Sequence, residues 1–175
     1  MTAQLTANRP VIRLRLPRRA HRGILVVHTL SSVAWLGVTL AMLTLAVSAV
    51  ATGDDTLTRA AYRADDLVGD LLIVPLGLTA AVSGVLLGVG SKWGLLRYWW
   101  VIVKLVLTIG GLTASLTVLR GHLDDAAAIS ADPASTGFDR LPVTLAVALA
   151  VASATYTLCT VISVLKPWGR RTTRS

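Results

Sequence analysis

Residues 24–51 read ILVVHTLSSVAWLGVTLAMLTLAVSAVA. This run is apolar and contains one ionisable side chain, that of His28. A helix needs about 20 apolar residues to cross a hydrocarbon core about 30 Å thick. Because a backbone inside a bilayer must satisfy its own hydrogen bonds, the run is predicted to be a membrane-spanning helix. It is also longer than the apolar region of about 7–15 residues in a signal peptide, so we expect it to be retained.

Three further apolar runs cover residues 67–90, 98–119 and 141–165, and each has the length of a membrane-crossing helix. Four such runs in 175 residues leave no room for a separate soluble domain. Short connections make successive helices antiparallel neighbours. The sequence therefore predicts an all-α polytopic membrane protein, an antiparallel up-down four-helix transmembrane bundle over 24–168, with basic tails at 1–23 and 169–175.

The basic residues divide unevenly between the connections. The formal net charge of +8 would suggest nucleic acid in a soluble protein. However, twelve of the 17 basic residues lie in the two tails and the middle connection, and only four lie in the other two connections. The positive-inside tendency places the richer side in the cytoplasm. We therefore expect both termini to be cytoplasmic, the lipid bilayer rather than nucleic acid to be the partner, and, from the arginine- and alanine-rich composition, a bacterial inner membrane.

The second run contains small residues at every fourth position, a spacing that lets two helix backbones approach closely. These residues are Ala80, Gly84 and Gly88. The pattern predicts close packing within the chain, and a homo-oligomer or a membrane partner is the alternative. Near the start of the same run, Asp70 is predicted to have a structural role and to pair with Arg63 or Arg120.

Each apolar run also contains polar side chains at helical spacing, and such residues share one face of their helix. They include Ser31, Ser32, Thr79, Ser83, Thr108, Ser153, Tyr156, Thr160 and Ser163. His28 lies about four residues inside the end of its helix, roughly 6 Å at ~1.5 Å per residue, and Lys104 lies about six residues inside the same end. Ionisable residues at such depth are rare and by default mark a functional site. The pattern predicts a shared site within the bundle.

The candidate site consists of His28, Lys104, Trp35 and Trp100, which would hold a cofactor or another small ligand. A plainer interpretation is also open. A lysine at this depth can extend its amine to the headgroups, and a histidine one turn from the interface can be merely interfacial. Tryptophans at the end of a membrane helix also form aromatic belts.

Two segments, HTLSSVAWLG (28–37) and WGLLRYWWVIVKLVLT (93–108), resemble an uncharacterised bacterial family of integral membrane proteins, over residues 20–168. The His-to-Trp spacing of the first segment and the aromatic-then-Lys-Leu order of the second are also similar, more distantly, to the membrane proteins of the CopD copper-resistance and HemJ protoporphyrinogen oxidase type. In the HemJ type, the corresponding histidine and lysine are implicated in haem binding and activity. The resemblance implies haem as a candidate cofactor, with His28 as the ligand of its iron and Lys104 as a charge partner.

Other cofactor chemistry has less support in the sequence. Copper handling needs several His, Met or Cys ligands, and the chain offers only Met1, Met42 and Cys159 without a cluster. Haem held by two histidines would need a second histidine inside the membrane, and the sequence has none. Three functions stay open: a membrane protein that binds haem or another small ligand, a HemJ-like oxidoreductase, and a structural, partner-binding subunit. Whether the protein is an enzyme is also open.

Overall fold

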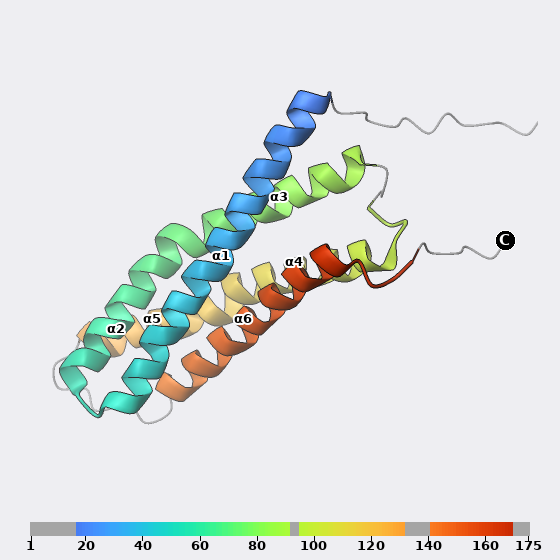
Figure 1. Cartoon of the computed structure of the whole chain (residues 1–175). Helices are drawn as coiled ribbons and strands as arrows, with labels where there is room; N and C mark the ends of the chain where they lie inside the picture. The colour runs from blue at the N-terminus through green and yellow to red at the C-terminus, as the bar shows by residue number, and fades with distance from the viewer. Residues whose placement is uncertain (1–16, 92–94, 132–140, 170–175) are drawn as a thin grey trace, which may run out of the picture.

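The structure, a computed structural model, describes residues 17–91, 95–131 and 141–169. Within these ranges the chain is helical and contains no strand, which confirms the predicted all-α class. The elements in chain order are α1 (Arg18–Thr52), α2 (Asp55–Val68), the π-helical turn η1 (Gly69–Ile73), α3 (Val74–Gly90), α4 (Trp99–Ala114), the π-helical turn η2 (Ser115–Leu119), α5 (Arg120–Ala131) and α6 (Leu141–Leu165) (Figure 1).

Four helical stretches of the described chain are long and apolar enough to cross a membrane. They are Arg18–Thr52, Asp55–Gly90, Trp99–Asp125 and Val143–Leu165. Most large apolar side chains of these stretches point outward, including Leu30, Val106 and Val164. A surface so rich in exposed leucine and valine is unfavourable in water and favourable against lipid tails. The structure therefore fits the multi-pass membrane protein that the sequence predicts.

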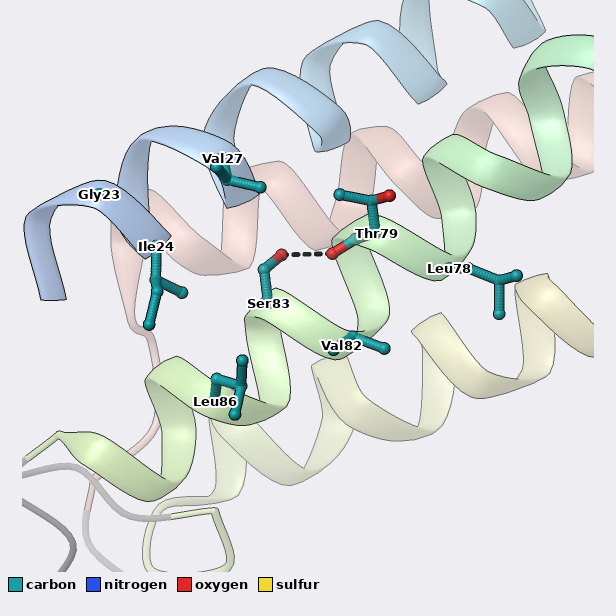
Figure 2. A pocket seen from close by; sticks show the side chains of 8 residues that line it. All are labelled: Gly23, Ile24, Val27, Leu78, Thr79, Val82, Ser83 and Leu86. Carbon is teal, nitrogen blue, oxygen red and sulfur yellow. Dashed lines mark hydrogen bonds between the residues drawn. The ribbon is translucent and has the colours of Figure 1, made fainter. Parts of the chain in front are cut away.

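The long helices lie side by side, and their ends gather at two places (Figure 1). The start of α1, the end of α3, the start of α4 and the end of α6 lie toward one end of the bundle, which we call the terminal end. The turn between α1 and α2 lies at the opposite end, together with α5, and we call this the hairpin end. At the terminal end, α1 and α3 leave an open apolar groove between them (Figure 2).

The helices extend beyond the apolar runs, and this corrects the predicted boundaries. Helix α1 begins at Arg18, inside the predicted basic tail, and ends at Thr52, where it is capped by Gly53, whose positive φ of 63° suits a glycine. Residues 55–66, predicted as part of a connection, form most of α2, because the Asp54 side chain accepts hydrogen bonds from the amides of Thr56 and Leu57 at 2.8 and 3.4 Å. Likewise, α5 continues the third run from Arg120 to Ala131. Hydropathy marks the part of a helix that lipid surrounds, and the helix itself continues further.

Parts of the two predicted tails and of two connections lie outside the described residues. These parts are residues 1–16, 92–94, 132–140 and 170–175. The predicted boundaries at 23 and 169 therefore concern segments that the structure describes only in part.

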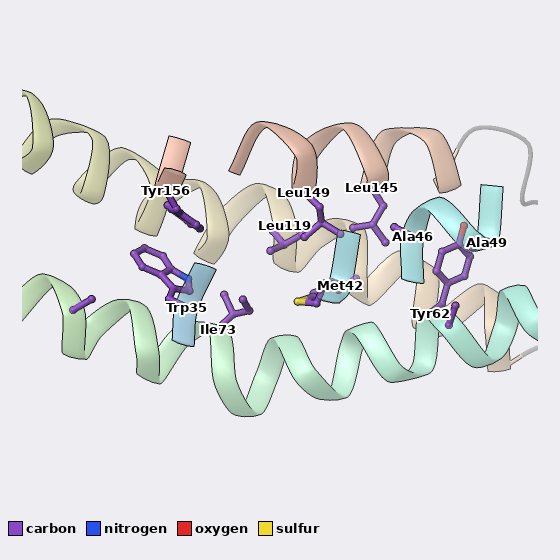
Figure 3. Packing of buried hydrophobic residues seen from close by; sticks show 13 residues of the cluster. Trp35, Met42, Ala46, Ala49, Tyr62, Ile73, Leu119, Leu145, Leu149 and Tyr156 are labelled. Atoms are coloured by element: carbon purple, nitrogen blue, oxygen red, sulfur yellow. The ribbon is translucent and has the colours of Figure 1, made fainter. Parts of the chain in front are cut away.

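The core of the bundle is concentrated in its middle and at the hairpin end (Figure 3). Met42 and Ala46 of α1, Tyr62 of α2 and Leu145 and Leu149 of α6 are completely buried there. Toward the terminal end, α4 has no buried residue at all, and the buried residues of α3 stop at Ser83. Buried side chains are therefore more frequent in the middle and at the hairpin end than at the terminal end.

Candidate ligand site at the terminal end

His28 is attached to α3 by hydrogen bonds across the α1–α3 contact. Its Nδ1 lies 3.0 Å from the carbonyl oxygen of Ala80 and 3.2 Å from Oγ of Ser83. The hydroxyl of Ser83 is itself directed at the carbonyl oxygens of Thr79 and Ala80 within its own helix. The imidazole is therefore turned toward a neighbouring helix and is half-buried there.

These contacts decide which ring nitrogen of His28 carries the proton. A carbonyl oxygen can only accept a hydrogen bond, so Nδ1 must donate to Ala80. In a neutral imidazole, Nε2 then keeps its lone pair. An Nδ1–H donated to a backbone carbonyl is the usual arrangement in a histidine that ligates a metal, because it fixes both the tautomer and the ring orientation.

Gly84 makes room for the ring of His28. A Cβ atom at Gly84 would lie 3.0 Å from Cε1 and 3.4 Å from Nδ1 of the imidazole. Gly77, two turns earlier, gives the same room to the indole of Trp35, and Gly88 to the side chain of Leu95. The predicted close packing at Ala80, Gly84 and Gly88 is thus confirmed within the chain, since Ala80 is also buried. The alternative, a partner that uses the same residues, stays a prediction.

Lys104 turns toward a different helix. Its Nζ donates a hydrogen bond to Oγ of Ser163 on α6, and this hydroxyl is hydrogen-bonded to the carbonyl of Cys159 at 2.9 Å. The thiol of Cys159 is close enough to interact electrostatically with the amine. Lys104 therefore lies between α4 and α6 and makes its polar contact inside the chain.

The two ionisable residues of the predicted site come near each other without touching. Lys104 is close enough for its charge to act on the imidazole of His28. Each residue nevertheless has its own hydrogen-bond partners, His28 on α3 and Lys104 on α6. Because two cationic groups repel each other, an anionic group in contact with both side chains would be favourable here.

The two tryptophans of the predicted site lie in different surroundings. Trp35 is buried in the core, where its indole stacks on the ring of Tyr156 with centroids 4.1 Å apart and planes at 33° (Figure 3). Its Nε1 is buried without a hydrogen-bond partner. Trp100 lies half-buried in the first turn of α4. The structure thus brings His28 and Lys104 into one region, with Trp100 in the same helix as Lys104, and places Trp35 in the closed core.

The groove between α1 and α3 has a volume of about 600 Å³ and is open along one side, and His28 is not among the residues that line it. Figure 2 shows that α1 contributes Gly23, Ile24 and Val27, and that α3 contributes Thr79, Ser83 and three apolar residues, Leu78, Val82 and Leu86. The lining is almost entirely apolar, with the hydroxyl-bearing Thr79 and Ser83 as the exceptions. Because Ser83 also contacts the imidazole of His28, the groove and the histidine share one wall.

A metal site built from several protein ligands is absent from the described part of the chain. No three side chains of His, Cys, Asp or Glu gather there in a way that could hold an ion. A cofactor in this region would therefore depend on His28 and on the apolar surface next to it.

Asp65 of α2 is a chemically important residue that the sequence analysis did not single out. It is completely buried, and neither carboxylate oxygen has a hydrogen-bond partner. The available signal was the spacing of Thr58, Tyr62 and Asp65, which places all three on one face of a helix.

Comparison with known proteins gives no relative: no family model, no curated protein and no solved structure matches this chain.

Proposed function

We propose that the chain is an antiparallel up-down four-helix bundle of a bacterial inner membrane, with both termini in the cytoplasm, and that it binds a small amphipathic ligand at its terminal end. Haem is the first candidate for that ligand. The distribution of basic residues supports the orientation, since the tails and the middle connection hold twelve of them. Ligand binding is supported above all by the hydrogen bond from Nδ1 of His28 to Ala80.

That hydrogen bond fits an axial ligand of haem. It leaves the lone pair of Nε2 for a metal, and a single histidine is sufficient to hold haem iron. The apolar groove, which includes the Ser83 that contacts His28, suits a flat apolar molecule. Lys104 would supply a cationic partner for a carboxylate of the ligand. Haem, when bound, would supply redox chemistry or a site for a small gas. The resemblance to the HemJ type concerns the same two residues and adds to the proposal.

The absorption spectrum of the full-length protein, purified in detergent from cells supplied with haem, tests this proposal. We expect a Soret band that is lost in His28→Ala and kept in His21→Ala, a histidine in the first turns of α1. Circular dichroism of both variants checks that they remain helical. A folded wild-type protein without a Soret band, or a band that survives in His28→Ala, would overturn the haem proposal.

The orientation is tested separately in cells. A cysteine introduced at Thr2, in a Cys159→Ser background, should react with a membrane-impermeant thiol reagent only after the cells are permeabilised. Reaction in intact cells would place the N-terminus outside.

A further inference from the structure

Helix α2 has a charged residue, Asp65, on its buried face. Asp65 is 0% exposed, whereas Leu67, two positions later, is 60% exposed. The buried face of α2 and η1 consists of Thr58, Ala61, Tyr62, Asp65, Gly69 and Ile73. Asp65 thus lies in the middle of the face that the bundle covers, and not on the face toward solvent or lipid headgroups.

The surroundings of Asp65 are closely packed and apolar. One turn further along the helix, a Cβ atom at Gly69 would lie 2.6 Å from Leu123 of α5 and 3.6 Å from Met42 of α1. Both of these side chains are buried, as is Tyr62 one turn before Asp65. The carboxyl is therefore enclosed where α2 packs on α1 and α5.

The nearby charged groups do not neutralise Asp65 by a hydrogen bond, since neither of its oxygens has a partner. On α5, Arg120 pairs with Asp70, and Asp124 acts on Asp66 at the rim of the contact. The other titratable groups of these two helices are Asp55, Arg59, Tyr62, Arg63, His122 and Asp125. The residues that α1 and α6 contribute to this part of the core, Met42, Ala46, Ala49, Leu145 and Leu149, have no titratable group.

Such a site strongly favours the protonated, neutral form of the carboxyl. An ionised carboxylate without a partner costs several kcal/mol in a dry apolar environment, and burying the neutral acid costs far less. A metal ion could compensate the charge, but the described chain has no group of three ligands for one. The ligand that this geometry accepts is a proton.

We propose that Asp65 is a proton-binding site whose proton holds α2 closed on α1 and α5. Loss of the proton leaves a charge that the closed packing does not tolerate, so α2 must move away and expose the carboxyl to water. The closed form is therefore favoured at low pH and is lost as the pH rises, because only the open form tolerates the ionised carboxyl. The site lies directly before the apolar run 67–90, so it exchanges its proton with the solution at the hairpin end.

Hydrogen–deuterium exchange of the full-length protein in nanodiscs tests this proposal across a pH series, after correction for the intrinsic exchange rate. Protection of residues 55–68 should fall with rising pH in the wild-type protein, by up to about tenfold per pH unit for one linked proton. In Asp65→Asn the side chain is neutral at every pH, so the protection should not change with pH, whatever its absolute level. The matched control Asp66→Asn, at the neighbouring and partly exposed position, should keep the wild-type dependence.

An infrared measurement covers the case in which Asp65→Asn does not fold. The wild-type protein at neutral pH should show the C=O stretch of a protonated carboxylic acid, and Asp66→Asn should keep it. Absence of that band in the wild-type protein, protection that does not vary with pH, or the same pH dependence in Asp65→Asn would overturn the proposal.

Discussion

The ionisable groups at the two ends of the bundle have opposite surroundings, although the same long helices form both ends. At the hairpin end the packing is close, and Asp65 is enclosed without a polar partner. At the terminal end fewer side chains are buried, and His28 and Lys104 each have hydrogen bonds to a neighbouring helix. The comparison indicates that burial at the hairpin end favours the neutral form of Asp65. At the terminal end, hydrogen bonds fix the orientation of His28 and Lys104 near an open groove.

The largest effect is expected when a buried and an exposed leucine of the same helix are each replaced by alanine. Leu149 and Leu158 both belong to α6, and they are 0% and 49% exposed. Leu149→Ala removes contacts in the closed core and should lower the free energy of unfolding by about 2–5 kcal/mol. Leu158→Ala should change it by less than about 0.5 kcal/mol, because that side chain is at the surface. Denaturant titration in detergent micelles measures both. Equal losses would contradict this difference in burial between the two side chains.

The second prediction concerns the border between the two ends. A Cβ atom at Gly77 would lie 2.9 Å from Cζ2 of Trp35, and this indole is held in place by its stack on Tyr156. Gly77→Ala should therefore cost about 1–3 kcal/mol of unfolding free energy. Gly110→Ala is the matched control on α4, where a Cβ would meet nothing within 4 Å. It should be neutral or stabilising, since alanine favours the helix by about 0.5–1 kcal/mol. Thermal unfolding distinguishes the two variants, and a stable Gly77→Ala would contradict the close contact.

The sequence was sufficient to predict the helices but not their full extent. Apolar runs such as 24–51 can only be helices in a bilayer, so the all-helical class followed directly. Helix α2 was missed because hydropathy counts the charges of residues 55–66 and not their spacing. Asp65 was missed for a related reason: its spacing from Thr58 and Tyr62 places it on one face of a helix, but whether that face is buried depends on where α5 packs.

The sequence was sufficient to predict how deep the residues of the candidate site lie along their helices, but not which residues they contact. Counting residues from the helix ends places His28 and Lys104 at similar depth, and the structure brings them within electrostatic range of each other. The rotation of each helix decides the rest. His28 reaches Ala80 because Gly84 has no side chain, and Lys104 reaches Ser163 because α6 is its neighbour. The predicted pairing of Asp70 with Arg63 or Arg120 is confirmed for Arg120.

The third prediction tests how the terminal end orients its histidine. In Gly84→Ala the new methyl group would lie 3.0 Å from Cε1 of His28, so the ring must shift by a few tenths of an ångström. The hydrogen bond from Nδ1 to Ala80 should weaken, with a cost of about 0.5–1.5 kcal/mol. Nitrogen NMR of the histidine-labelled protein should show the Nδ1–H tautomer in the wild type and a mixture of tautomers in the variant. Gly37→Ala, which meets nothing within 4 Å, is the control and should keep the wild-type spectrum.

The smallest effect is expected at the ion pair of Asp70 with Arg120, which lies on the surface of the hairpin end. Both side chains are well exposed, at 47% and 37%, so water and salt screen their attraction. A double-mutant cycle with Asp70→Asn and Arg120→Gln should give a coupling of about 0.2–1 kcal/mol that decreases in high salt. Asp70 and Asp65 are five residues apart on one continuous helix, and Asp65 is the buried one of the two. The hydrogen–deuterium exchange of residues 55–68 should therefore keep its pH dependence in Asp70→Asn. If that dependence disappears, the linked proton belongs to the surface pair, and the two ends differ only in their packing.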